Sequence, residues 1–149
     1  MKKILIIPLL LAIITLPAQA ARVINSVLLN DIVPDSNSPL IIDNEDTIKV
    51  TMTVTTSGNG ANNNWKSTSY SLNGATSICI DTPNENGIDT YTNEFYTEAL
   101  TNGTYSISFY AHRNDNCNPS SDSNNFEFTD AITVSPSVTL IAEYRFDET

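Results

Sequence analysis

The two cysteines are the residues best able to form a covalent cross-link in this chain of 149 residues. Cys79 and Cys117 have no other cysteine to pair with. In an oxidising compartment a disulfide is the default for such a pair. The spacing is not the C-x-x-C of redox enzymes, so we expect a structural bridge. It would join the strand around residues 78–80 to the polar loop that follows residues 105–113, which is not the inter-sheet pairing of antibody domains.

A single histidine, His112, limits the enzymatic chemistry that is open to the chain. A Ser-His-Asp hydrolase would have to use it, and the sequence has no G-x-S-x-G nucleophile motif. One histidine and two cysteines cannot build a four-ligand Cys/His zinc site. Strand alternation places His112 on a polar face beside Tyr110, which predicts an exposed side chain. We expect no enzymatic activity and no cofactor, although composition leaves a glycosidase carboxylate pair open.

Acidic residues dominate the charge, with 17 Asp and Glu against 7 Lys and Arg and a formal net charge of −10. Such a chain does not neutralise phosphates, so nucleic-acid binding is disfavoured. Residues 114–125 contain Asp115, Asp122 and several asparagines, and calcium prefers oxygen ligands of this kind. No EF-hand sequence is present. We expect these acids to be solvated turn residues, with a calcium site at Asp115 and Asp122 as the alternative.

The first twenty residues have the pattern of a secretory signal peptide. A basic start, Met1-Lys2-Lys3, precedes a 13-residue apolar run over residues 4–16, and Ala18-Gln19-Ala20 supplies a small-residue cleavage site. The run is shorter than the roughly 20 residues needed to span a bilayer. We therefore expect cleavage after residue 20, no membrane span in the mature chain, and a secreted, periplasmic or cell-surface location. An uncleaved membrane anchor is the alternative.

Alternating apolar and polar residues predict β-strands throughout the rest of the chain. The clearest run has apolar residues at every second position between 48 and 55: Ile48, Val50, Met52 and Val54. Residues 105–112 and 126–134 repeat this pattern, and Asp130 interrupts the second of them, which indicates a bulge or a short turn. Weaker strands are expected at residues 22–29, 65–72, 76–80 and 89–97. No sustained helical period is present.

Seven short antiparallel strands predict an all-β fold, an immunoglobulin-like β-sandwich over residues 21–134. Tyr105 stands near a strand start and either bonds back to the preceding corner, as in Greek-key sandwiches, or is an ordinary core aromatic. Trp65 is expected to pack between the sheets, with a surface tryptophan that stacks on a sugar as the alternative. The hydroxyl-rich outer faces favour a spacer that does not self-associate. They also leave open glycan binding through an aromatic such as Tyr110.

The last residues form a separate unit in the sequence. Residues 135–137 (Ser-Pro-Ser) have the composition of a linker. Residues 138–146 then alternate as a new strand, with Leu140, Ala142, Tyr144 and Phe146 on one face. This strand either joins the edge of the sandwich or begins a second domain.

The tail carries a family resemblance. Its core Ala142-Glu143-Tyr144-Arg145-Phe146-Asp147-Glu148 resembles the opening strand of laminin-G/concanavalin-like domains of bacterial surface proteins, among them the MSHA pilus biogenesis protein Q group. The preceding ninety residues resemble the Ig-like modules in front of such domains. The pieces that match there are Thr51-Met52-Thr53-Val54, Trp65-Lys66-Ser67-Thr68-Ser69-Tyr70, Cys79 with Asp81-Thr82-Pro83, Gly103-Thr104-Tyr105, and Cys117.

The resemblance implies an exported adhesion or pilus-associated role without catalysis. We therefore expect a surface β-sandwich module that acts as a spacer or interaction domain, as part of a larger surface assembly. Residues 138–149 would be the first strand of a lectin-like domain that is otherwise missing. The alternative is a stand-alone module that binds a surface glycan or protein, with Trp65 and Tyr110 as its contacts. An envelope hydrolase is a third and less favoured hypothesis.

Overall fold

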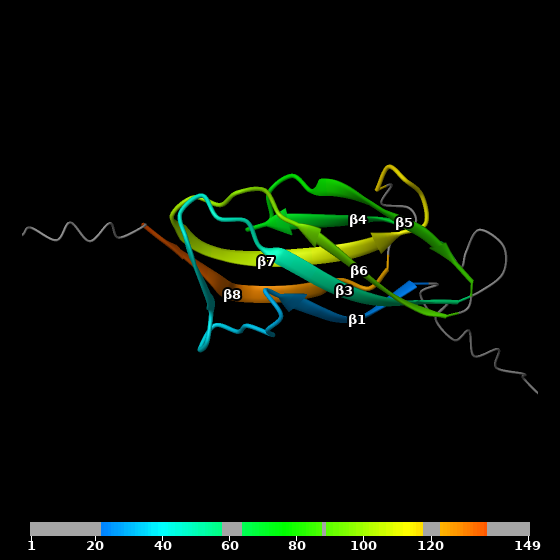
Figure 1. Ribbon diagram of the computed structural model, residues 1–149, viewed down its shortest axis with the longest axis horizontal. Helices are drawn as coiled ribbons and strands as arrows, with labels where there is room; N and C mark the ends of the chain where they lie inside the picture. The colour runs from blue at the N-terminus through cyan, green and yellow to red at the C-terminus, as the bar shows by residue number, and fades with distance from the viewer. Residues whose placement is uncertain (1–21, 58–63, 88, 118–122, 137–149) are drawn as a thin grey trace, which may run out of the picture.

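The computed structural model describes residues 22–57, 64–87, 89–117 and 123–136. These residues form eight β-strands and no helix, so the predicted all-β class is confirmed (Figure 1). The strands, in chain order, are β1 (Arg22–Leu29), β2 (Leu40–Asp43), β3 (Lys49–Thr56), β4 (Asn64–Leu72), β5 (Ile78–Asn86), β6 (Thr90–Tyr96), β7 (Gly103–His112) and β8 (Phe126–Ser135). No helix of the described residues is long and apolar enough to cross a membrane.

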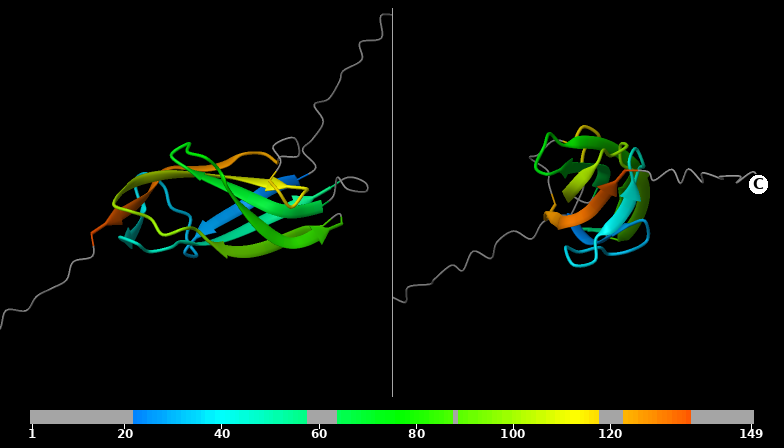
Figure 2. Two further views of the ribbon diagram at one scale, coloured as in Figure 1. Left: turned by 90° about the horizontal axis from the view of Figure 1, so that it is seen from above. Right: turned by 90° about the vertical axis from the view of Figure 1, so that its left-hand side faces the viewer.

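The strands form two sheets that pack face to face (Figures 1 and 2). The smaller sheet has the order β1-β3-β6, and the larger has the order β2-β8-β7-β4-β5. The expectation of seven antiparallel strands was wrong in one respect, because β2 is an eighth strand and pairs in parallel with β8. This strand is only four residues long, so a two-residue period has little room to show in its sequence.

Six of the eight described strands have the order found in immunoglobulin-like sandwiches. Strands β1, β3 and β6 take the places of strands A, B and E, and β4, β7 and β8 take those of C, F and G. Tyr105 lies near the start of β7, and its hydroxyl donates a hydrogen bond of 2.8 Å to the carbonyl oxygen of Thr101. This is the corner interaction typical of such sandwiches, so the predicted bond back to the corner is confirmed.

The hydrophobic core lies between the two sheets and follows the predicted alternation. Successive side chains of a strand point to opposite faces, and the four apolar residues of the run at 48–54 are all fully buried. An aromatic cluster joins the sheets, with the Tyr70 ring centroid 6.2 Å from that of Phe95 and 6.4 Å from that of Phe109. Ring pairs at this spacing add to the free energy gained from burial alone.

A β-bulge lies in β8 at the residue that interrupts its alternation. Asp130 has a φ of 48°, and the register with β7 shifts between Tyr105 and Ile107. The Asp130 amide donates to the Ser106 hydroxyl, with 2.9 Å between the two atoms. Of the two outcomes predicted at Asp130, the bulge is the one observed, and β8 continues past it to Ser135.

The sandwich is elongated, and the two ends of the described chain lie at its opposite ends (Figures 1 and 2). Arg22 begins β1 at the end where β7 finishes, and Ser135 closes β8 beside Asp43 at the other end. The predicted signal peptide (1–20) and the predicted lectin-like strand (138–149) lie outside the described residues. Of the predicted linker, Ser135 belongs to β8 and Pro136 follows it.

Candidate functional site

The outer face of the larger sheet carries a polar row where β4 and β7 run side by side. Thr68 and Tyr70 of β4 point toward the core, so the alternating serines of this strand point outward. Across the sheet, Ser67 pairs with His112, Ser69 with Tyr110, and Ser71 with Ser108. The serine alternation is visible in the sequence of β4, but the partners that it meets depend on the register between two strands about forty residues apart.

The predicted disulfide is present at one end of this row. The sulfurs of Cys79 and Cys117 are 2.09 Å apart and the two Cα atoms 5.8 Å apart. Cys79 lies on the edge strand β5, and Cys117 lies in the loop that follows β7. The bridge therefore spans the outer face of β4 and holds this loop against the sheet, as the sequence analysis expected.

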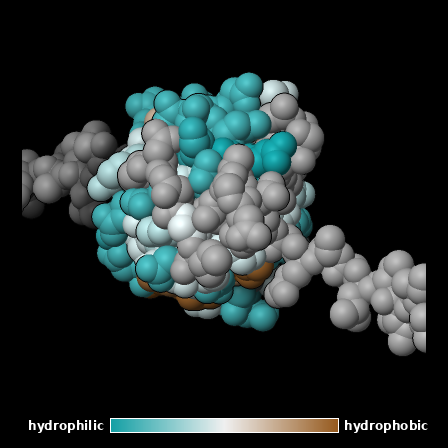
Figure 3. Space-filling view, turned by 90° about the vertical axis from the view of Figure 1, so that its right-hand side faces the viewer, coloured by the Kyte–Doolittle hydropathy of each residue, from teal (hydrophilic) through white to brown (hydrophobic). Residues whose placement is uncertain are grey.

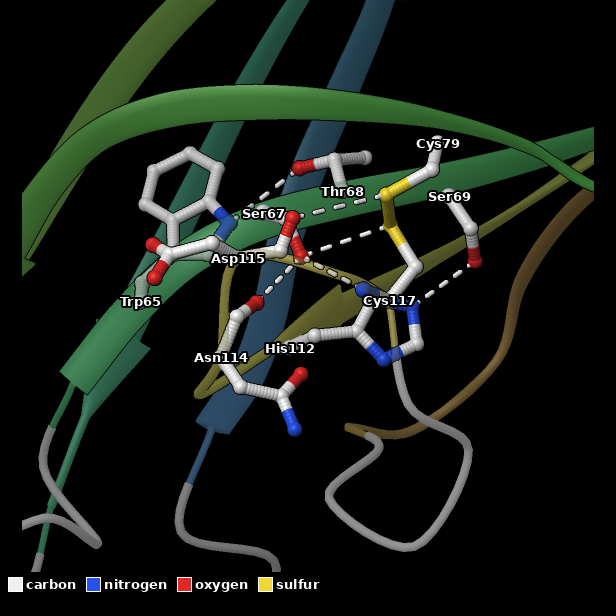
Figure 4. Close-up of a disulfide and its surroundings, with 9 residues drawn as sticks. All are labelled: Trp65, Ser67, Thr68, Ser69, Cys79, His112, Asn114, Asp115 and Cys117. Atoms are coloured by element: carbon white, nitrogen blue, oxygen red, sulfur yellow. Dashed lines mark hydrogen bonds between the residues drawn. A yellow bond between two sulfur atoms is a disulfide. The ribbon is translucent and has the colours of Figure 1, made fainter.

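The Ser67 hydroxyl also holds this loop, through hydrogen bonds to its backbone (Figure 4). The hydroxyl donates to the carbonyl oxygen of Asn114 at 2.5 Å and accepts from the amide of Cys117 at 3.2 Å. The hydroxyl oxygen also lies 3.3 Å from the Sγ of Cys117. Ser67 is fully buried, and a buried hydroxyl that satisfies two backbone groups is costly to remove. The loop is thus held by one covalent bond and by two hydrogen bonds.

His112 lies under this loop and is only 2% exposed. The prediction of an exposed surface histidine was wrong. The predicted face of the strand was right, because the His112 ring lies on the outer face of β7. The loop that the disulfide holds against the sheet nevertheless covers this ring (Figure 4). The His112 Nε2 and the Ser69 hydroxyl are joined by a hydrogen bond of 2.8 Å. Strand alternation predicts the face of the sheet on which a side chain lies, but it does not predict whether a loop covers that face.

An open hollow of about 440 Å³ lies beside the disulfide. Its lining comes from β4, the start of β5, β7 and the disulfide loop: Ser69, Ser77, Tyr110, His112, Asn116 and the disulfide itself. Tyr110, which the sequence analysis chose as a ligand contact, is half-buried and borders this hollow. The lining offers hydroxyl, amide, imidazole and aromatic groups, so it is suited to hydrogen bonding and stacking more than to ion pairing.

Trp65 does not border the hollow and is 0% exposed. It packs in the core, as the favoured expectation held, and the alternative of a surface tryptophan that stacks on a sugar was wrong. Its indole N–H donates to the Thr68 hydroxyl at 3.1 Å. The ring is therefore satisfied inside the protein, and Trp65 is removed from the predicted ligand contacts.

Of the two predicted calcium ligands, the structure describes Asp115. The Asp115 side chain is 65% exposed, and a carboxylate oxygen lies 3.9 Å from the Nζ of Lys66. Asp122 lies outside the described residues. Within the described ranges, no three His, Cys, Asp or Glu side chains stand close enough together to hold a metal ion.

Comparison of the chain with protein-family models, with curated proteins and with solved structures gave no significant match. The fold and the chemistry of this end of the sandwich therefore supply the evidence for a function.

Proposed function

We propose that this chain is an exported, non-enzymatic immunoglobulin-like module that acts as a rigid spacer in a surface assembly. The observation that carries the proposal is the placement of Arg22 and Ser135 at opposite ends of the long axis (Figure 1). A domain that the chain enters at one end and leaves at the other adds its whole length to the distance between its neighbours. A domain with adjacent termini adds almost none.

Rigidity is supported by the way in which both ends of the sandwich are fastened. The Tyr105 hydroxyl ties the start of β7 to the preceding corner, and the disulfide ties the loop that follows β7 to the edge strand β5. A bridge closing a loop of this length is worth about 4 kcal/mol in the chain-entropy model. Neither end of the central strand β7 is thus left to fray.

The outer face of the smaller sheet is suited to a spacer that stays separate from its copies. Threonine hydroxyls of β3 form hydrogen bonds with threonine hydroxyls of β6. The Oγ1 atoms of Thr53 and Thr92 are 3.1 Å apart, and those of Thr55 and Thr90 are 2.7 Å apart. The end of the molecule where β1 begins is mostly hydrophilic where the described residues are visible (Figure 3). A net charge of −10 adds repulsion between copies.

Export is supported by the disulfide, because such bonds persist in oxidising compartments, and by the signal-peptide pattern of residues 1–20. We propose a periplasmic or cell-surface location on these grounds. An adhesion or pilus-associated role, with residues 138–149 opening a laminin-G-like domain, rests on the resemblance of the tail. The partners would then be neighbouring domains of the same assembly and a surface glycan or protein.

The proposal is tested by the place and the mass of the product in the producing cell. An antiserum raised against residues 22–134 is used on intact cells and on blots of separated envelope and cytoplasmic fractions. We expect labelling of the envelope fraction and a product larger than the 129 residues that remain after signal cleavage (149 − 20). An antiserum against a cytoplasmic protein is the control for leakage. A cytoplasmic product, or an exported one of only 129 residues, contradicts the spacer proposal.

A further inference from the structure

We propose that the hollow beside the disulfide binds one unit of a neutral carbohydrate. This inference goes beyond the spacer role and does not depend on it. The volume of about 440 Å³ lies in the range of about 300–1,000 Å³ that is usual for small-molecule sites. Ser69, Tyr110 and His112 of the lining lie on the paired strands β4 and β7, which hold them in fixed positions.

The lining groups match the chemistry of a sugar. The hydroxyls of Ser69 and Ser77 and the amide of Asn116 can each exchange hydrogen bonds with a sugar hydroxyl. Tyr110 adds an aromatic ring with a polar tip, and the apolar C–H face of a pyranose packs well on such a ring. A mixture of a few polar groups and one flat apolar surface is what a polyhydroxylated ring requires.

Charge selects against an acidic ligand. Among the residues that the structure describes, the lining contains no Lys or Arg, and the chain carries a net charge of −10. Asp115, next to Asn116 in the disulfide loop, is largely exposed. A uronic acid or a phosphate would therefore meet a negative field, and the nearby Lys66 already lies 3.9 Å from the Asp115 carboxylate. Among sugars, a neutral unit is favoured.

The site is organised before any ligand arrives. The disulfide and the Ser67 hydroxyl hold the loop that carries Asn116. The hydrogen bond of 2.8 Å between Ser69 and His112 fixes both polar groups at the base of the hollow (Figure 4). Groups that are already immobilised cost less entropy on binding.

The test is an NMR titration of the oxidised ¹⁵N-labelled protein. The probes are the methyl glycosides of glucose, galactose, mannose and N-acetylglucosamine, with glucuronate as the charged comparison. We expect saturable amide shifts confined to the neighbourhoods of Ser77, Tyr110 and Asn116 for at least one neutral glycoside. The dissociation constant should be on the order of millimolar, as for other ligands of this size. Glucuronate should produce no such shifts.

Three variants test whether the glycoside binds in the hollow. Tyr110→Ala should weaken binding about tenfold, because it removes a stacking contact. Asn116→Ala, at an exposed loop position that leaves the core intact, should also weaken it. Tyr96→Ala, at an exposed tyrosine of the other sheet, is the matched control and should bind as the wild type does. No saturable shift with any neutral glycoside, equal shifts with glucuronate, or unchanged binding by both Tyr110→Ala and Asn116→Ala would overturn the proposal.

Discussion

The Tyr105 hydroxyl donates a hydrogen bond to the carbonyl oxygen of Thr101, with 2.8 Å between the two oxygens. The bond connects β7 to the corner that brings the chain across from the other sheet. Tyr105→Phe keeps the ring and removes this bond together with the 3.1 Å bond between the hydroxyls of Tyr105 and Thr101, so we expect the free energy of unfolding to fall by about 1 kcal/mol. Urea unfolding measures the change. Tyr96→Phe, at a tyrosine that is 62% exposed, is the control, and an equal loss in both variants would contradict the role given to the corner.

The disulfide should be a large part of the stability of this small domain. Replacing both cysteines, Cys79→Ser with Cys117→Ser, removes a cross-link that closes a 38-residue separation. We expect a loss of about 4 kcal/mol, measured by urea unfolding against the oxidised wild type. Reduction of the wild-type protein should give a similar loss. A change below about 1 kcal/mol in both experiments would show that the loop is held without the bridge.

Trp65 should behave as a core residue in solution. It is the single tryptophan of the chain and is 0% exposed, so its fluorescence reports on one site. We expect an emission maximum shifted to the blue and little quenching by iodide until the protein unfolds. Trp65→Ala should cost about 3–5 kcal/mol, because it leaves a large cavity. Free quenching of the folded protein would mean that the ring is at the surface.

Stability should fall at high pH through Tyr70. Burial is the main cause that raises the pKa of Tyr70 above its ordinary value of 10.0, and the amide of Glu98, which donates to its oxygen, opposes the shift. The unfolded chain therefore loses this proton at a lower pH than the folded chain. The resulting stabilisation is complete below about pH 10 and is lost as the pH rises through the higher folded value.

Tyr70→Phe removes this contribution, so its stability should decline less steeply above about pH 10 than that of the wild type. The comparison needs both proteins, because the hydrogen bond that Lys49 donates to Asp31 raises the pKa of Lys49. This shift also makes the stability fall as the pH rises. Lys49 is present in both. Urea unfolding across this pH range measures how steeply the free energy of unfolding falls with pH in each protein. An equally steep fall in both proteins would contradict the account of Tyr70.

The sequence predicted the strands that bury one face and alternate clearly. The clearest strand was predicted correctly, because a two-residue period over eight residues has no other simple explanation. Its buried residues are Ile48, Val50, Met52 and Val54. Two strand predictions failed for local reasons. β2 is too short to show a period, and β5 continues past Ile80 to Asn86 through Pro83, which an edge strand tolerates but which reads as a turn in the sequence.

The candidate site was predictable only in part. Two cysteines in a chain that begins with a signal-peptide pattern indicate a bridge, and that prediction was confirmed. The burial of His112 depends on how the bridge folds the loop over β4, and this is information about tertiary structure. The hollow likewise depends on tertiary structure, because the pairing of β5 and β7 with β4 brings Ser77 near Tyr110 and the bridge holds the loop of Asn116 beside them. No local pattern in the sequence joins these three positions.

The measurement that tests the spacer most directly is the distance between the two ends of the folded domain. Spin labels on unnatural amino acids at Ser57 and Pro136, both exposed, leave the disulfide untouched. Strands β7 and β8 are each ten residues long, so the account predicts one narrow distance of roughly 30–40 Å by double electron–electron resonance. A broad distribution, or a separation of the labels below about 20 Å, would contradict a rigid spacer with its termini at opposite ends.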